Sequence, residues 1–211
     1  MLFRKNDKEK INNTEDIPEA LPTDPTDDEY AHQGNRNSSF AKMLLKDILL
    51  CAVITCIILT FVSPTIVNQT SMLPTCQQGD YILLEKQAYL FKEPQRGDII
   101  VFKSKIKNEN GIMSKLLIKR IIAIPKDNVK IEGGQVYING EKLDEKYLPL
   151  DTYTEGDIDR IIPEDTYFVM GDNRDVSVDS RDSEVGLVSK KDIYGKALVR
   201  LLPLKNAGKV E

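Results

Sequence analysis

Apolar and polar positions divide the 211-residue chain into three regions of different character. Residues 1 to 41 are rich in charged residues, Asn, Pro and Ser, and they offer too little apolar surface to offset the entropy lost on ordering. An uncharged run of 20 residues from Ile48 to Val67 follows, and beyond it short apolar runs alternate with turn residues. The pattern predicts a disordered tail over residues 1–41, a transmembrane anchor over 42–67 and a β-rich domain over 68–211.

The uncharged run is long enough for a transmembrane helix, because 20 residues at about 1.5 Å each span the roughly 30 Å hydrocarbon core of a bilayer. Pro64 predicts that regular helix ends at about Ser63. A cleavable secretory signal is the competing interpretation, but the charged leader is far longer than a signal's n-region and no A-x-A-like site follows. The basic residues near the run precede it: Arg36, Lys42 and Lys46. This bias predicts an uncleaved, single-pass anchor in the cell membrane, with a cytoplasmic N-terminus and the β-rich domain outside.

After the anchor, the apolar runs are short, rich in β-branched residues and separated by turn signals, whereas helical periodicity is weak. The Asn139-Gly140 pair favours a type I′ turn, so residues 129–143 are predicted to form two hairpins in tandem. Residues 144–163 are predicted to be a polar surface connector, and the tail after Pro203 to be frayed. The domain is therefore predicted to be mainly β and antiparallel. Its predicted strands are Tyr81–Leu84, Asp98–Phe102, Leu116–Ile124, Val129–Ile131, Val136–Ile138, Tyr167–Met170 and Ala197–Leu202.

Composition argues against several classes of function. The chain has no Cys/His cluster with metal-ligand spacing and no glycine-rich phosphate loop, so neither a metal nor another cofactor is expected. A calcium loop at residues 172–175 is disfavoured because Arg174 stands where such a loop needs Asp or Asn. Basic residues are interspersed with acids and lack an aromatic-lined patch, which disfavours nucleic-acid binding. Only Cys76 lies beyond the anchor, so no disulfide is expected within the β-rich domain.

The candidate catalytic residues are a serine and a lysine. The single histidine, His32, lies in the tail on the other side of the anchor, so a Ser-His-Asp triad cannot form around Ser71 and a serine hydrolase would need lysine as its base. Alternation in the run Leu116 to Ile122 places Lys119 among aliphatic side chains, and burial there lowers the pKa of an amine as a base requires. Two alternatives stay open: Lys119 is a surface lysine at a strand edge, or Cys76 is the nucleophile, although no histidine activates it.

Four motifs, in order along the chain, carry a family resemblance. They are Ser71-Met72-Leu73-Pro74-Thr75, then Arg96-Gly97-Asp98-Ile99-Ile100-Val101-Phe102, then Lys119-Arg120 with Pro125 and Asp127, then Gly171-Asp172-Asn173-Arg174 with Ser177, Asp179, Ser180 and Arg181. In these motifs the chain resembles the bacterial type I signal peptidases, Ser-Lys endopeptidases of the peptidase S26 family. The resemblance runs from about Ser63 through Gly195-Lys196-Ala197. It implies a barrel-like antiparallel β fold behind one N-terminal transmembrane helix.

The resemblance also implies catalytic roles for the matched residues. Ser71 attacks the scissile carbonyl and forms an acyl-enzyme, while Lys119 accepts the serine proton and returns it to the leaving amine. Ser177 orients the lysine amine by a hydrogen bond. The implied supporting residues are the ion pair Asp179 and Arg181 together with Asp172 and Arg174.

The oxyanion hole is where the chain departs from the family pattern. The backbone N–H of Ser71 is the natural first donor. The family usually has serine or glycine two positions before the nucleophile, but this chain has Gln69, so the Gln69 amide and the Thr70 hydroxyl stay open as the second donor. Ala123 and Lys126 stand where the family usually has glycines, which changes the backbone freedom of that turn.

By the same resemblance, the substrates are the signal peptides of exported preproteins, cut after small residues at A-x-A-like sites. The peptide binds extended along strand edges near residues 67–70 and 116–118. The candidate substrate-binding residues are Met72, Leu117 and Ile118. Because Ser71 follows the apolar run by four residues, the nucleophile is expected near the bilayer surface, with the lipid bilayer and the protein-export machinery as further partners.

Two other classes of function are compatible with parts of the chain. A catalytically silent, membrane-tethered β domain would lack the lysine, which this chain has, and Gln69 is the one feature that favours it. A self-cleaving Ser-Lys regulator like the phage-type repressors would need a DNA-binding helix pair at the N-terminus. This chain has a polar tail and an apolar anchor there instead.

Overall fold

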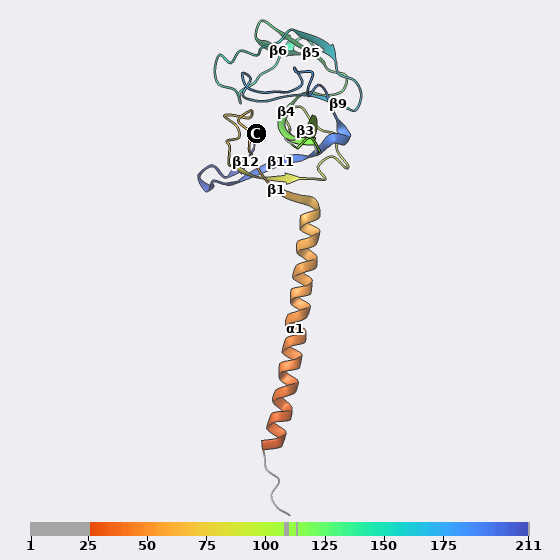
Figure 1. Cartoon of the computed structure of the whole chain (residues 1–211), viewed down its shortest axis with the longest axis vertical. Helices are drawn as coiled ribbons and strands as arrows, with labels where there is room; N and C mark the ends of the chain where they lie inside the picture. The colour runs from red at the N-terminus through yellow and green to blue at the C-terminus, as the bar shows by residue number, and fades with distance from the viewer. Residues whose placement is uncertain (1–25, 108–109, 113, 211) are drawn as a thin grey trace, which may run out of the picture. The chain divides into compact units, whose positions relative to one another are not determined.

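The computed structural model describes residues 26–107, 110–112 and 114–210 (Figure 1). The chain divides into two compact units, Met1–Cys51 and Ala52–Glu211. Residues 1–25 of the tail that is predicted to be disordered lie outside the described residues. Residues 26–41 of that tail form the first part of helix α1 (Thr26–Phe61). Extending an existing helix adds one hydrogen bond for each residue fixed, so helix continues from apolar into polar sequence.

The apolar part of α1 is Ser39–Phe61, a segment of 23 residues with mean hydropathy 2.3 and no buried residue in its most apolar window. By length and composition it is able to cross a membrane. The helix ends at Phe61, slightly before the predicted end near Ser63. The next residues, predicted to belong to the anchor, form strand β1 (Val62–Ile66), which pairs with β2. Pro64 is tolerated in β1 because the strand lies at the edge of its sheet.

The larger sheet has 8 strands, all paired antiparallel, in the order β1-β2-β11-β3-β4-β9-β10 with β12 beside β11. All five strands predicted for this region form. Strands β10 and β12 are not predicted, because two residues are too short to show alternation. Beyond β1 its strands are β2 (Tyr81–Glu85), β3 (Ile99–Lys107), β4 (Ser114–Ala123), β9 (Thr166–Met170), β10 (Val188–Ser189), β11 (Ile193–Leu202) and β12 (Gly208–Lys209).

The smaller sheet has 4 strands in the order β7-β6-β5-β8. Its members are β5 (Asn128–Glu132), β6 (Gln135–Ile138), β7 (Glu141–Lys142) and β8 (Ile158–Ile161). The tandem hairpins are confirmed, and Asn139 and Gly140 both have positive φ, 53° and 87°, as a type I′ turn needs. The connector over residues 144–163 differs from the prediction because its end forms β8, which pairs with β5.

The tail after Pro203 also differs from the frayed segment predicted. It contains the 3-10 helix η2 (Leu204–Asn206) and β12, and Val210 is buried in the core. A second 3-10 turn, η1 (Lys190–Asp192), leads into β11. Burial of one apolar side chain and pairing with β11 are long-range contacts, which a short polar tail does not announce in its sequence.

Strand β4 connects the three apolar clusters that make the core. Ile118 belongs to the first cluster, Ile122 to the second, and Leu117 and Ile121 to the third. Burying an aliphatic side chain of this size stabilises a fold by roughly 1.5 to 3 kcal/mol. Lys119 therefore lies in a strand whose side chains pack into all three clusters, and these neighbours hold its backbone in place.

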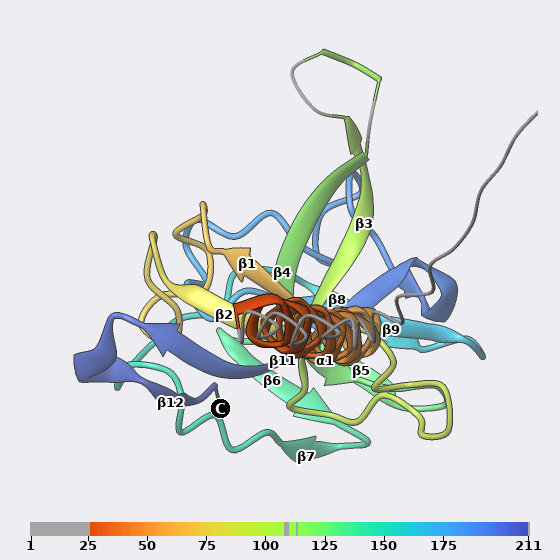
Figure 2. The ribbon, with the colours of Figure 1, turned by 90° about the horizontal axis from the view of Figure 1, so that it is seen from below.

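The two sheets and the long β3–β4 ribbon organise the β domain in space. β5 and β6 lie at one end of this domain and β1, β11 and β12 at the other, with β3 and β4 between them (Figure 1). Seen along the perpendicular direction, the ribbon of β3 and β4 projects well beyond the other strands (Figure 2). Lys119 lies on β4 away from the tip of this ribbon, next to Arg120, where β9 begins to pair with β4.

Candidate active site

Ser71 lies in the segment between β1 and β2. This loop is closed at its base, where Val67 N–H donates to the Asp80 carbonyl at 2.9 Å and Gly79 N–H donates to the Val67 carbonyl at 2.8 Å. Ser71 is buried, with 7% of its surface exposed. Met72, next to it, is fully buried in the first core cluster. The serine is thus held by a loop whose inner face is part of the core.

Lys119 meets the serine hydroxyl. Its Nζ donates to Ser71 Oγ at 2.5 Å, and the lysine is 1% exposed. Burial lowers the pKa of the amine from its ordinary 10.5 to about 8, although the nearby carboxylates of Asp179 and Asp172 act in the opposite direction. A substantial neutral fraction therefore exists at mildly alkaline pH. The structure brings the two predicted catalytic residues into contact, and the surface position considered for Lys119 is wrong.

Gly171 packs directly against the nucleophile loop. A Cβ at this position would collide with the Ser71 carbonyl oxygen and with the Ser177 side chain. The Gly171 N–H donates to both Ser177 Oγ, at 3.1 Å, and Asp179 Oδ2, at 3.0 Å. Ser177 therefore lies beside the dyad, but among the described residues its hydroxyl bonds Gly171 and not Lys119.

A buried ion pair joins β4 to the segment after β9, and a hydrogen bond from Thr75 links that pair to the nucleophile loop. Arg120 Nε and Nη2 donate to the two oxygens of Asp172 at 2.9 and 2.7 Å, and the Thr75 hydroxyl donates to Asp172 at 2.5 Å. The Arg120 guanidinium lies 3.8 Å from the ring centroid of Tyr147. A bidentate pair of this kind is geometrically specific. It fixes Thr75, four positions after the nucleophile, relative to the strand that carries the lysine.

Two further arginines hold the loop that follows β9. Arg181 Nε and Nη2 donate to Asp179 at 2.9 and 3.0 Å, so the predicted Asp179–Arg181 ion pair is present. Arg174 Nε donates to the Gly171 carbonyl at 3.1 Å, and its guanidinium forms an ion pair with Glu145. Asp179 is fully buried and the Arg174 side chain is 0% exposed, so both charges depend on these partners.

Several residues of this network escape prediction from sequence. The additional contacts of the Arg174 guanidinium are Thr154 and Tyr147, and Asn173 bonds the backbone of the nucleophile loop at Thr70 and Ser71. Glu145 and Tyr147 lie in the polar connector, where no motif or periodicity marks them. Asn173 is the exception, because it stands inside the Gly171-Asp172-Asn173-Arg174 motif.

A pocket of about 390 Å³ opens over the dyad. Leu117 and Gln69, both singled out from the sequence, line it. Met72 and Ile118, the other predicted substrate-binding residues, are instead packed in the first core cluster. The residues lining the pocket are Asn68, Gln69, Thr70, Ser71, Gln78, Ile106, Lys115, Leu117, Lys119, Val176 and Val178.

Backbone geometry leaves an oxyanion donor free. Among the described residues, the Ser71 N–H donates to no protein acceptor, and Gln69 and Thr70 stand beside it in the pocket lining. Lys126, where the family usually has glycine, adopts φ 73°, a conformation that glycine takes up more readily. Ala123 is fully buried at the end of β4. These departures lie outside the Ser71–Lys119 contact.

The alternative nucleophile is poorly suited to attack. Cys76 is fully buried in the first core cluster, and burial raises the pKa of its thiol to about 12. A thiol with that pKa is protonated at neutral pH, and reactivity resides in the thiolate. Across residues 26–107, 110–112 and 114–210, no group of three or more His, Cys, Asp or Glu side chains is arranged to hold a metal ion.

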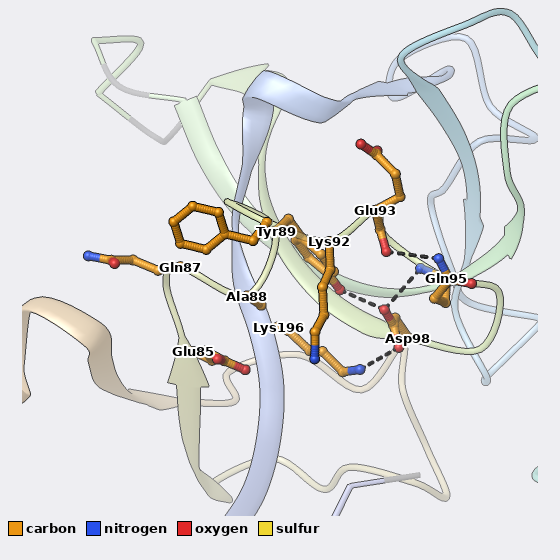
Figure 3. A pocket seen from close by; sticks show the side chains of 10 residues that line it. Glu85, Gln87, Ala88, Tyr89, Lys92, Glu93, Gln95, Asp98 and Lys196 are labelled. Atoms are coloured by element: carbon orange, nitrogen blue, oxygen red, sulfur yellow. Dashed lines mark hydrogen bonds and ion pairs between the residues drawn. The ribbon is translucent and has the colours of Figure 1, made fainter.

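A separate pocket of about 250 Å³ lies near the start of β3 (Figure 3). Asp98 accepts hydrogen bonds there from Tyr89 Oη at 2.9 Å, Gln95 N–H at 3.0 Å and Lys196 Nζ at 2.6 Å. These contacts join the Arg96-Gly97-Asp98 motif to the Gly195-Lys196-Ala197 segment of β11. Because Asp98 is already engaged by three donors, we interpret this pocket as structural.

Known proteins are similar in sequence to this chain over about two thirds of its length. The family described as "Signal peptidase, peptidase S26" matches residues 41–202. Signal peptidase I of Leptolyngbya laminosa is 38% identical over 142 residues, covering 66% of this chain and 68% of that protein. Signal peptidase I of Bacillus licheniformis is 34% identical over 154 residues, covering 69% and 79%.

A solved structure is also similar. The crystal structure of a signal peptidase I from Enterococcus faecalis V583 has 31% sequence identity and a TM-score of 0.41, and it covers 50% of this chain and 97% of that one. The sequence matches include the serine loop, strand β4 and the Gly171 segment that meet in the structure. On the extent of the family match and of the identity to curated members, the chain belongs to the signal peptidase family, peptidase S26.

Proposed function

We propose that this chain is a membrane-bound serine endopeptidase that removes N-terminal signal peptides from exported preproteins, with Ser71 as nucleophile and Lys119 as general base. The observation that carries the proposal is the 2.5 Å contact between Lys119 Nζ and Ser71 Oγ. Burial supports it, because the pKa of the amine falls to about 8 and a base needs a neutral amine.

Each proton in the reaction is moved by Lys119. The neutral amine takes the proton of Ser71 as Oγ attacks the scissile carbonyl, and the resulting ammonium gives it to the leaving amine, which leaves an acyl-enzyme. The amine then takes a proton from water, and the hydroxide equivalent attacks the acyl carbonyl. Return of that proton to Ser71 Oγ releases the signal peptide as a carboxylic acid, which loses its remaining proton to solvent and becomes a carboxylate.

Oxyanion donors and supporting residues surround the Ser71–Lys119 dyad. The Ser71 N–H faces no protein acceptor among the described residues and serves as the first oxyanion donor. Gln69 or Thr70 supplies the second. Asp172, Arg174, Asp179 and Arg181 hold the loops, and Ser177 orients the amine once a substrate is bound and its hydroxyl turns from Gly171.

Substrate binds along the free edge of β4. Strand β3 pairs with β4 from Ser114 to Arg120, but β9 pairs only with Arg120, Ile121 and Ala123. Among the described residues, no strand covers the other edge of β4 before Arg120. An extended peptide laid there pairs through its backbone, and Leu117 contacts the small side chains of an A-x-A-like site.

The proposed function includes attachment to the membrane. The segment Ser39–Phe61 spans the bilayer, with the N-terminus cytoplasmic and the β domain outside, because the basic residues Lys42 and Lys46 precede the apolar run. The apolar segment of the precursor's signal peptide lies in the lipid bilayer, which places the cleavage site near the enzyme. The protein-export machinery delivers that precursor to the same membrane.

The test is cleavage of a labelled precursor by the detergent-solubilised full chain, with the new N-terminus read by mass spectrometry. We expect wild type to cut after a small residue, and Ser71→Ala and Lys119→Arg to be inactive, because guanidinium stays protonated and cannot accept the serine proton. Cys76→Ser is the control that keeps most activity. A folded wild type that leaves several precursors intact would favour the catalytically silent β domain instead.

A further inference from the structure

Strand β4 carries two lysines on its pocket face. Lys115, Leu117 and Lys119 alternate along the strand and all line the pocket over Ser71. Lys119 is buried, whereas Lys115 is exposed. At about 3.3 Å per residue their Cα atoms lie roughly 13 Å apart. Lys115 is therefore at the far end of the face that begins at the catalytic base.

Charge in this pocket is one-sided. Its lining includes both lysines but no Asp or Glu. The carboxylates nearest the dyad are buried and already paired, Asp172 with Arg120 and Asp179 with Arg181. Among the described residues, Lys115 forms no ion pair. Its positive charge is left for a group that enters the pocket.

Electrostatic influence of Lys115 reaches the dyad. Burial is the main cause of the lowered pKa of Lys119, and the charges of Arg181 and Lys115 lower it further, whereas Asp179 and Asp172 raise it. Lys115 is thus close enough to interact with a charge bound between itself and the serine. A bound carboxylate is the group of opposite charge.

We propose that Lys115 is a specificity-determining residue that favours an acidic side chain at the fifth residue before the cut. This inference rests on the proposed function, in which substrate pairs with the free edge of β4. Side chains of an extended peptide alternate in step with those of the strand. If the residue before the cut lies at Lys119, the third before the cut lies at Leu117 and the fifth at Lys115.

The experiment compares three peptides that differ only by Glu, Gln or Lys at the fifth residue before the cut, using full-length protein in detergent. We expect wild-type kcat/KM to fall in that order, by about two- to five-fold between Glu and Lys, because an exposed ion pair is weak. The preference shrinks at high salt. The same three changes at the fourth residue, whose side chain points away, have no comparable effect.

Charge reversal supplies the decisive variant. Lys115→Glu inverts the order, so that the Lys peptide becomes the better substrate. Lys103→Glu is the matched control, because Lys103 lies opposite Leu116 on β3, is exposed, and is outside the pocket lining. It keeps the wild-type order.

Two outcomes separate this inference from the function on which it rests. Equal kcat/KM for the three peptides in wild type, or an unchanged order in Lys115→Glu, overturns the role of Lys115 when Ser71→Ala is inactive. Cleavage that persists in Ser71→Ala overturns the proposed serine mechanism, and with it the inference about Lys115 that rests on it.

Discussion

At the scale of the residue, Lys119 shows how burial changes chemistry. An exposed lysine is an ammonium at neutral pH and is no base, but this one is 1% exposed among aliphatic neighbours. The same desolvation that frees its lone pair also costs stability whenever the amine is protonated. Activity and stability therefore depend on pH through one group.

The pH profile of the enzyme follows from this amine. Its pKa of about 8 means that the neutral fraction grows as pH rises through that value. We expect kcat/KM for a neutral peptide substrate to rise with pH, with a midpoint near 8. The measurement is a rate profile between about pH 6 and pH 10, and a flat profile would remove Lys119 from the role of base.

Stability has the matching dependence. Below pH 8 the amine is protonated in both the folded and the unfolded chain, so the cost of burying an ammonium is present in full. Between 8 and 10.5 only the unfolded chain binds the proton, so the free energy of unfolding rises with pH. The gap between these pKa values corresponds to on the order of 3 kcal/mol.

We therefore predict that Lys119→Met, although inactive, is more stable than wild type at pH 7, by on the order of 3 kcal/mol, because the ammonium is gone. The difference shrinks toward zero near pH 10.5. Denaturant unfolding at both pH values measures it, with Lys103→Met as an exposed control. A variant less stable than wild type at pH 7 would contradict this.

Gly171 has no room for a side chain. A methyl group there would meet the Ser71 carbonyl and the Ser177 side chain. We predict that Gly171→Ala displaces the nucleophile loop and lowers kcat by at least about 100-fold, since misplacement by about 1 Å has that effect. Glu141→Ala, at an exposed position of β7, is the control for a substitution away from the site. Activity close to wild type in Gly171→Ala would show that the loop is free to move.

At the scale of the element, the polar connector acts as a brace for the loop after β9. Glu145 accepts from the Arg174 guanidinium, and Arg174 in turn donates to the Gly171 carbonyl. Tyr147 stacks on Arg120 and donates its hydroxyl proton to Glu145 at 2.7 Å. Two buried arginines that hold the site are thus both covered by one short segment of chain.

Removing the brace has a predictable cost. Glu145→Ala leaves the Arg174 guanidinium buried without its carboxylate, and we expect it to lower the free energy of unfolding by about 3 to 5 kcal/mol. Glu145→Gln, which keeps an acceptor but no charge, falls between this variant and wild type. Glu141→Ala, at an exposed position of β7, stays within about 0.5 kcal/mol. Urea unfolding compares the three, and equal values for Glu145→Ala and Glu141→Ala would contradict the brace.

At the scale of the whole molecule, helix α1 ends at Phe61 and strand β1 begins at Val62. Strand β1 belongs to the large sheet, where it pairs with β2 along its full length. It is thus a structural part of the domain although its composition resembles the anchor. Val67, just after it, belongs to the first core cluster.

Truncation tests this boundary. We predict that residues 62–211 fold, whereas residues 67–211, which lack β1, are less stable by about 2 to 4 kcal/mol because the outer edge of β2 and its apolar contacts become exposed. Both proteins lack the apolar helix, so a difference in stability between them reports the loss of β1 alone. Equal unfolding midpoints in urea would place β1 with the anchor after all.

Local sequence predicts much of the secondary structure of this protein. Alternation and turn residues predict the long strands β2 to β6, β9 and β11, because each depends on the side chains of its own few residues. Asn139-Gly140 predicts its turn because positive φ is a property of those two residue types. The only histidine, His32, precedes the anchor, so the sequence predicts a lysine base for Ser71. The resemblance of the four motifs to the type I signal peptidases is what selects Lys119 among the lysines.

The sequence by itself determined the β class and the apolar anchor candidate, since these depend on residue type and short-range pattern, and its motifs pointed to Ser71 and Lys119 through their family resemblance. Only the tertiary structure decided that Met72 is buried in the core, that β1 and β8 join their sheets, and that Glu145 and Tyr147 cover Arg174 and Arg120. The physical reason is that these outcomes depend on contacts between residues far apart in the chain. Such contacts leave no periodicity in either segment, and they arise only when the fold brings the two together.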